Sequence, residues 1–254
     1  MQSRILTTGL SAVILAMTTL PAFAQTSDDA AIDELVVTSQ RRGQPLLSHA
    51  GNVERLDEET LSAVLHHHMH ELLTRVSGVW LSRGSGQEHL TAIRSPVLTG
   101  AGSCGAFLFL EDGIPIRPAG FCNVNSLFEI NTEQARSVEV IRGPGNALYG
   151  SNALHGTVNV LMPEPGPDRV AQAALEVGAN DFYRARVEFP FDADSPWFAS
   201  AMYANDGGFR DDAGYQQAKL HAKHRWLLSD GSFTLALTCL LYTSPSPRDC
   251  GPDL

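Results

Sequence analysis

The sequence predicts an α+β domain, built from a small mixed sheet and short helices, followed by a series of antiparallel strands. Between Phe107 and Val160, short apolar runs end in turn-forming residues, which is typical of strands in a compact domain. From Arg169 onward, alternating runs of about ten residues are separated by short turns. The segment Met162–Asp168, MPEPGPD, lies between the two patterns, and its prolines and glycine predict a domain boundary.

Three strands are expected within residues 107–160. Apolar alternation predicts strands at Phe107–Leu110 and Val138–Ile141, and a third follows at Gly156–Val160. Asn131–Arg136 is predicted to form one or two helical turns, because Asn131 can cap the first turn and an acidic residue lies within it. The glycines of this region are assigned to turns and close-packed positions: Gly113, Gly143, Gly145, Gly150 and Gly156.

Some of these glycines superficially resemble a phosphate-binding loop, but their spacing argues against both common kinds. A P-loop requires a lysine after its second glycine, whereas Ser151 follows Gly150. A dinucleotide-binding loop requires a third glycine at the position that Leu148 occupies. Nucleotide binding is therefore not expected.

One helix is predicted upstream, over Leu56–Arg75. Acidic residues occupy its first turn, and leucines and a valine recur at helical spacing. His66 and His70 are four residues apart within it, which is the spacing of a helical metal-binding pair. Because no third ligand apart from Glu71 is evident nearby, the histidines are interpreted as a surface cluster and no metal site is expected.

The first residues of the 254-residue chain are typical of a secretory signal peptide, Met1–Ala24. Arg4 provides the positive start, Ile5–Leu20 is mostly apolar, and Ala22-Phe23-Ala24 is a small-x-small cleavage site. No apolar run of about 18 residues follows, so a transmembrane helix is not expected in the mature chain. The 28 acidic residues outnumber the 18 basic ones, and the net charge of −10 argues against a nucleic-acid-binding surface.

Three stretches resemble the plug domain of TonB-dependent outer-membrane receptors, in which a small globular domain fills a large membrane barrel. They are LTAIRS (residues 90–95), LEDGIPI (110–116) and SVEVIRGPGNALYGSNALHGTVNV (137–160). The resemblance implies an α+β plug domain over residues 45–163, with a further strand pair at its start that ends in Leu90–Arg94. It also implies that the start of an antiparallel transmembrane β-barrel follows, incomplete in this chain.

The alternating runs then correspond to about five barrel strands in residues 169–238, with aromatic residues near the strand ends as in an aromatic girdle. A plugged barrel has about 22 strands, so the chain is expected to hold only the N-terminal part of such a receptor. Residues 239–254 abandon the alternation, add Cys239 and Cys250, and resemble translated foreign sequence. No function is assigned to this tail.

The lead-in over residues 25–44 contains a short β-prone run that resembles the TonB box. Receptors of this family expose that segment to the periplasm and offer it as an added strand to TonB and the inner-membrane energising complex. An extended β-branched segment suits strand addition, since main-chain hydrogen bonds provide the pairing. A disordered linker is the alternative interpretation. The box-like residues are Leu35, Val36, Val37, Thr38 and Ser39.

Two arginines end predicted strands, Arg94 in LTAIRS and Arg142 in SVEVIR. The resemblance implies that both face acidic residues on the inner wall of the barrel. An enclosed guanidinium group requires such a carboxylate partner. Two solvated arginines at strand ends are the alternative.

Cys104 and Cys122 lie in loops on either side of the strand Phe107–Leu110. In an exported protein, two loop cysteines favour a disulfide. Closing a loop of this size stabilises a fold by roughly 3 kcal/mol. A catalytic thiol is disfavoured, because no histidine and acid arrangement near either cysteine provides a base.

The resemblance implies TonB-dependent active transport of a small molecule across the outer membrane of a bacterium, with outer-membrane lipid around the barrel. The first expectation for the cargo is a ferric chelate such as a siderophore, followed by cobalamin or an oligosaccharide. A passive porin or an adhesin-type barrel is the alternative. No enzyme activity or cofactor is expected, since the sequence offers no convergent nucleophile, base and oxyanion site. The residues expected to face the ligand are Arg117, Phe121, Asn123 and Asn125.

Overall fold

The computed structural model describes residues 36–37, 44–45, 51–84, 86–97, 106–116, 130–145, 153–166, 169–191, 196–210 and 213–244. Several predicted features lie outside these ranges and stay predictions. They are the signal peptide, the Cys104–Cys122 disulfide, Gly150 and the ligand-facing residues Arg117, Phe121, Asn123 and Asn125.

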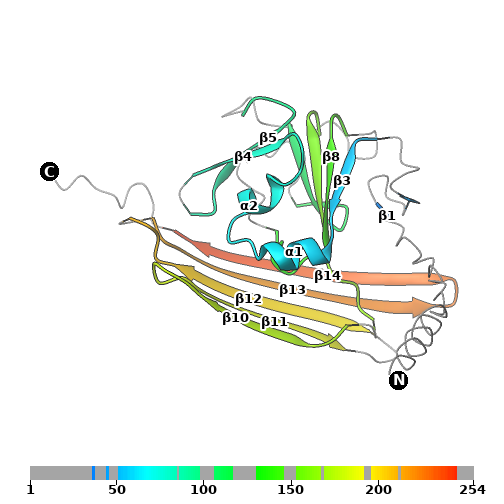
Figure 1. Ribbon diagram of the computed structural model, residues 1–254. Helices are drawn as coiled ribbons and strands as arrows, with labels where there is room; N and C mark the ends of the chain where they lie inside the picture. Colours follow the sequence, from blue (N-terminus) through cyan, green and yellow to red (C-terminus); the bar gives the residue numbers. More distant parts are fainter. Residues whose placement is uncertain are drawn as a thin grey trace, which may run out of the picture. The chain divides into compact units, whose positions relative to one another are not determined.

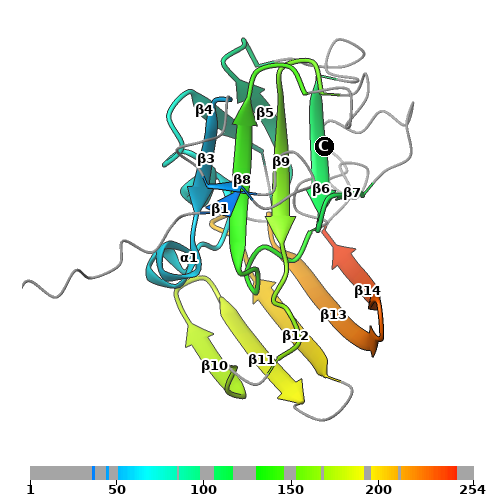
Figure 2. The same ribbon diagram turned by 90° about the vertical axis from the view of Figure 1, so that its right-hand side faces the viewer.

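The α+β domain is organised around a five-stranded sheet with the order β3-β8-β9-β6-β7. Figure 2 shows β3, β8, β9 and β6 side by side in this order. The sheet is mixed, because β9 runs parallel to β6 but antiparallel to β8. The three strands predicted in residues 107–160 are therefore confirmed. The strand bounds are Val53–Leu56 (β3), Phe107–Glu111 (β6), Ile114–Pro115 (β7), Ser137–Arg142 (β8) and Gly156–Leu161 (β9).

The middle of this sheet is buried on both faces. Every residue of β9 is buried, and so are the first four of β8. Val138, Val140, Val158 and Val160 belong to the main core with the helices and the strand β4 (Val79–Arg83), whereas a smaller cluster forms around Leu108 and Leu110. A strand covered on both faces needs apolar or fully hydrogen-bonded residues at nearly every position.

Two short helices replace the single helix predicted over Leu56–Arg75. They are α1 at Glu58–Val64 and α2 at Met69–Leu73. The Asp57 side chain caps α1 by accepting a 2.9 Å hydrogen bond from the Thr60 amide. Leu65 then adopts a left-handed conformation with φ of 46°, which ends the helix.

The helical turn predicted at Asn131–Arg136 is also absent. The segment forms a non-helical turn, in which the Asn131 side chain donates to the Gln134 side chain at 2.9 Å. Its backbone carbonyl groups bind side chains from strands far along the chain, as described below. Such hydrogen bonds compete with those of a helix.

The strand pair at the start of the domain is confirmed. β4 (Val79–Arg83) and β5 (His89–Ile93) form a separate antiparallel two-stranded sheet. Arg94 follows β5 with a positive φ of 50°, so the strand ends one residue before the predicted boundary.

Five antiparallel strands follow in sequence order, as Figure 1 shows for β10 to β14. The described residues therefore form an α+β domain followed by the start of a barrel that is not closed, which confirms the predicted fold class. The last strand runs past residue 238, the predicted end of the regular region, as far as Thr243. The bounds are Gln172–Val177 (β10), Tyr183–Phe191 (β11), Trp197–Asp206 (β12), Tyr215–Leu228 (β13) and Gly231–Thr243 (β14).

Buried and more exposed side chains alternate along β12 and most of β13, as a two-faced sheet requires, whereas β10 and β14 are exposed along almost their whole length. In β12, Phe198, Met202 and Ala204 are buried, while Trp197 and Tyr203 are exposed. In the described part of the chain, no helix combines the length and the apolar character that crossing a bilayer requires.

A substitution at Gly156 tests the close packing of β9. A Cβ atom at this position would lie 2.7 Å from Ile93 Cδ1 and 2.9 Å from the Ile141 carbonyl oxygen. We expect Gly156→Ala to lower the free energy of unfolding by about 1–3 kcal/mol, the usual cost of overpacking a core. The measurement is urea-induced unfolding of the full-length protein. Gly166→Ala is the control, since no atom lies within 4 Å of its added Cβ. Equal stability of the two variants would contradict the packing assigned to β9.

Candidate functional site

The box-like segment is partly described. Val36 and Val37 form a short strand, β1, that pairs antiparallel with Gln44–Pro45 (β2). Val36 lies opposite Pro45, and Val37 lies opposite Gln44. Leu35, Thr38 and Ser39 lie outside the described residues. The two valines are thus extended, as strand addition would require.

The two strand-ending arginines have different surroundings. Arg142 Nη1 lies 2.8 Å from Glu54 Oε2 of β3 and donates to the Ser77 carbonyl at 2.7 Å. Its carboxylate partner among the described residues therefore belongs to the same domain and not to the barrel strands. Arg94 is exposed, and its side chain lies against Gly78. Contacts of either arginine with a barrel wall stay predictions.

The described contacts between the α+β domain and the barrel strands are made by residues other than Arg94 and Arg142. The strands β11 and β13 provide the cations, and the domain provides carboxylates and carbonyl oxygens. The sequence contains a signal for this that the prediction missed. Alternate residues of β13 that face the domain are polar, whereas Leu220 on the other face is exposed and apolar. These inward residues are Gln217, Lys219, His221 and Lys223.

The centre of this interface is a buried ion pair between Lys219 and Glu133. Lys219 Nζ lies 3.0 and 2.8 Å from the two carboxylate oxygens, and it also donates to the Ile130 carbonyl at 2.8 Å. The side chains are only 2% and 4% exposed. Burial alone would raise the pKa of Glu133, but Lys219 outweighs it, with a hydrogen bond as well as its charge, and the pKa falls to about 2. Glu133 is therefore ionised at neutral pH.

Further hydrogen bonds fix the turn that carries Glu133. Arg186 Nη1 of β11 donates to the Glu133 carbonyl at 3.0 Å. The side-chain amide of Gln134 donates to the Val187 carbonyl at 3.0 Å and to the Ala201 carbonyl at 3.3 Å. The turn is therefore held by β11, β12 and β13 together.

Arg184 of β11 makes a second anchor, at the end of α1. Its guanidinium donates to the His66 carbonyl at 2.6 Å and to the Leu65 carbonyl at 3.1 Å, and it lies 2.5 Å from Glu176 Oε2. Carbonyl groups at a helix C-terminus lack internal partners and favour a positive charge. With the side chain only 2% exposed, Arg184 ties the junction between the two helices to the barrel strands.

The histidines at this junction do not form a surface cluster, which corrects the prediction. His66 and His68 are buried, and only His67 of the run is exposed. His66 Nε2 lies 3.1 Å from Thr132 Oγ1. Burial lowers the pKa of His66 to about 4, with Arg184 and Lys219 adding to the effect and Glu133 opposing it. Among the described residues, no group of three or more His, Cys, Asp or Glu could hold a metal ion.

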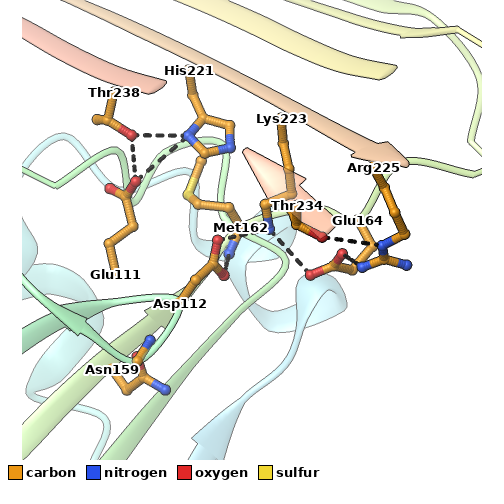
Figure 3. Close-up of polar contacts among 11 residues, drawn as sticks. Glu111, Asp112, Asn159, Met162, Glu164, His221, Lys223, Arg225, Thr234 and Thr238 are labelled. Atoms are coloured by element: carbon orange, nitrogen blue, oxygen red, sulfur yellow. Dashed lines mark hydrogen bonds and ion pairs between the residues drawn. The ribbon is translucent and has the colours of Figure 1, made fainter. Parts of the chain in front are cut away.

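The third anchor is the turn of LEDGIPI, shown in Figure 3. Asp112 and Gly113 both have positive φ values, 49° and 78°, as a tight hairpin turn requires. One Asp112 oxygen accepts a hydrogen bond from the Met162 amide at 2.9 Å, and the other lies 2.6 Å from Lys223 Nζ. The Gly113 amide donates to Asn159 Oδ1 at 2.9 Å. The turn thus joins β9 to the barrel strand β13.

Carboxylates on both sides of this turn extend the contact. Glu164 pairs with Lys223 at 3.1 Å and with Arg225, and Glu111 lies 3.5 Å from His221 Nδ1 and accepts from Thr238 (Figure 3). Burial would raise the pKa of Glu111, but the hydrogen bonds from His221 and Thr238 and the charge of Lys223 lower it overall. The interface is therefore charged and hydrogen-bonded along its length.

A cleft of about 210 Å³ is lined by residues near the ends of β4, β12 and β13 and by Asn180. Its lining combines charged, amide and aromatic groups, including Arg83, Asn180, Asp206, Phe209 and Tyr215. Pockets that enclose a drug-sized ligand measure roughly 300–1,000 Å³. The cleft formed by the described residues is therefore smaller than such a pocket.

Comparison with known proteins gives the family of the α+β domain. Residues 45–157 match the model of the TonB-dependent Receptor Plug Domain. The sequence is 28% identical to the vitamin B12 transporter BtuB of Vibrio vulnificus (strain CMCP6) over 184 residues, which are 72% of this chain and 28% of that protein. The chain thus spans well under a third of this relative.

Solved structures show the same fold. The Pseudomonas aeruginosa receptor FpvA, bound to a heterologous pyoverdine, is similar with a TM-score of 0.67 and 17% identity, over 81% of this chain and 27% of that one. The alcaligin outer-membrane receptor FauA of Bordetella pertussis has a TM-score of 0.66 and 14% identity, over 82% and 35%. Both likenesses extend beyond the plug into the barrel strands.

Replacing Lys219 tests the buried ion pair. We expect Lys219→Met to lower the free energy of unfolding by about 3–5 kcal/mol, because Glu133 would stay buried without its cation. The double variant Lys219→Met/Glu133→Gln removes the unpaired charge and should recover part of the loss. Urea-induced unfolding of the full-length protein provides the measurement, and Gln216→Met, an exposed neighbour in β13, is the control.

The pH dependence of the same pair has a defined sign. The folded-state pKa of Glu133, about 2, lies below its ordinary value of 4.5. The pair therefore stabilises the fold fully above pH 4.5, and this contribution is lost as the pH falls toward 2. Lys219→Met should flatten the stability profile in that range. An unchanged profile, or a double variant no more stable than the single one, would contradict this account.

Proposed function

We propose that this chain, which holds the plug domain and the first barrel strands of a TonB-dependent receptor, serves energised uptake of a small molecule across the bacterial outer membrane. The proposal includes location in that membrane, after export by the N-terminal signal peptide. TonB and the inner-membrane energising complex are the proposed protein partners.

The observation that supports this function best is the way the plug is attached to the barrel strands. Lys219 and Arg184 bind different segments of the plug through charged hydrogen bonds, and Lys223 forms an ion pair with Asp112 in a third segment. Water can replace such partners when the plug moves, so the net cost of separation is smaller than the gross strength of the bonds. A plug held in this way is fixed at rest and remains removable.

The box-like segment provides the point at which force would be applied. Val36 and Val37 are already extended in β1, and a strand of this kind can pair with a partner through its main chain. Tension on this segment would reach the plug along the chain, at β3. Conversion of the cargo is not part of the proposal, so no catalytic residue is assigned.

For the cargo, we propose a metal chelate, with a ferric siderophore as the first candidate. FpvA and FauA, which share the fold, are receptors for pyoverdine and alcaligin. Cobalamin, itself a cobalt chelate, is the second candidate, because the sequence resembles a vitamin B12 transporter at 28% identity. Uptake of an oligosaccharide, or passive diffusion through the barrel, would exclude a metal chelate as the actively transported cargo.

Val37→Pro tests the strand-addition step in the full-length receptor. Proline removes an amide donor that strand pairing needs, whereas the control Val37→Thr keeps both the donor and the β-branched shape. We expect Val37→Pro to reduce uptake of the radiolabelled chelate at least tenfold, to the level seen in cells without a proton-motive force, while binding to the cell surface persists. Val37→Thr should transport normally. Uptake that persists in Val37→Pro would contradict TonB-dependent transport and favour a passive pore.

A further inference from the structure

The helix α2 begins with an unusual cap. His68 has the extended backbone of an N-cap residue, with φ of −138° and ψ of 144°, and its ring Nδ1 accepts a 2.9 Å hydrogen bond from the His70 amide. Serine, threonine, aspartate and asparagine normally fill this role, and none of them changes its acceptor near neutral pH. An imidazole accepts only while Nδ1 is unprotonated. The cap therefore fixes the neutral ring with its proton on Nε2.

The surroundings of His68 disfavour protonation of its neutral ring. The side chain is fully buried, and its ring meets the edge of the His89 ring with centroids 5.4 Å apart. Within the described residues, neither His68 Nε2 nor His89 Nε2 makes a hydrogen bond of normal geometry. The groups that act on His68 from the neighbouring elements are His70 of α2, Arg83 of β4, His89 of β5 and the Gln87 backbone.

The electrostatic environment of His68 favours the neutral ring. Burial lowers the pKa of His68 most, His89, Arg83 and His70 lower it further, and the Gln87 backbone opposes them, so that the pKa falls to about 3. A proton on His68 would also place a positive charge at the start of α2, where the helix dipole disfavours it.

The cap lies beside a contact with the barrel strands. His66 and Leu65, two and three residues before His68, give their carbonyl groups to Arg184, and the Gln87 side chain binds the His67 carbonyl at 2.8 Å. Loss of the cap would weaken the start of α2 beside these bonds, where the Glu71 carboxylate also accepts from the His67 amide at 2.9 Å.

We propose that His68 is a pH-sensitive cap, which holds the start of α2 at neutral pH and releases this part of the plug from the barrel strands in acid. The device is independent of the cargo and of TonB. Because the folded-state pKa lies below the ordinary value of 6.5, the stabilisation is complete above pH 6.5 and declines as the pH falls toward 3.

Hydrogen exchange of the full-length receptor tests this proposal. The protection of the α2 amides, corrected for the intrinsic exchange rate, is compared between pH 7 and pH 4.5. We expect the contribution of His68 to this protection to fall by up to about tenfold per pH unit below 6.5, the limit for one proton. His68→Asn should keep a cap that does not titrate and show a flatter profile, whatever its protection at pH 7. His67→Asn, which removes the exposed neighbour, should behave as the wild type.

Equal pH profiles for His68→Asn and the wild type would overturn the proposal. If the variant does not fold, imidazole ¹⁵N resonances of the histidine-labelled wild type provide the second measurement. At pH 7 the His68 ring should carry its proton on Nε2 alone. A proton on Nδ1 would exclude the cap and the switch with it.

Discussion

The attachment of the plug depends on one buried contact, the Lys219 ammonium group with the Glu133 carboxylate and the Ile130 carbonyl. A charged group removed from water is stable only when its hydrogen-bonding positions are filled. Lys219 therefore requires a turn that presents a carbonyl and a carboxylate close together. This requirement explains why residues 130–136 form an extended turn although their sequence would allow a helical one. The local conformation is determined by the opposite strand.

The same logic explains the polarity of the interface. The inner faces of β11 and β13 carry lysines and arginines that would be costly to bury alone, and the plug supplies the oxygens that satisfy them. Some of those oxygens are carboxylates, as in Asp112, and others are main-chain carbonyls, as at Leu65 and His66. A carbonyl accepts a hydrogen bond whatever the side chain of its residue. Charge pairing along the sequence could therefore identify only part of the interface, and it did not indicate the cations of β11 and β13.

Features that arise from local chemistry could be predicted from the sequence. The strands at 107–110, 138–141 and 156–160, the Asp112-Gly113 turn and the alternation of β10–β14 follow from side-chain period and turn residues. The break between α1 and α2 could not be predicted, because Leu65 has no helix-ending character of its own. Its left-handed conformation is compensated by Arg184, which lies 119 residues away along the chain. His68 was missed for a different reason, since a histidine caps a helix only in one tautomer that its surroundings select.

The break in the helix and the docking of Arg184 are consequences of each other. In a continuous helix over residues 56–75, the Leu65 and His66 carbonyls would accept from amides four residues further on. The guanidinium of Arg184 would then be buried with only Glu176 as a partner, which would leave most of its donors without acceptors. Ending α1 at Val64 frees these two carbonyls for Arg184 and leaves the amides of α2 in need of a cap, which His68 provides. The plug thus gives up hydrogen bonds within one helix in exchange for bonds to the barrel strands, and its helical junction becomes part of the interface.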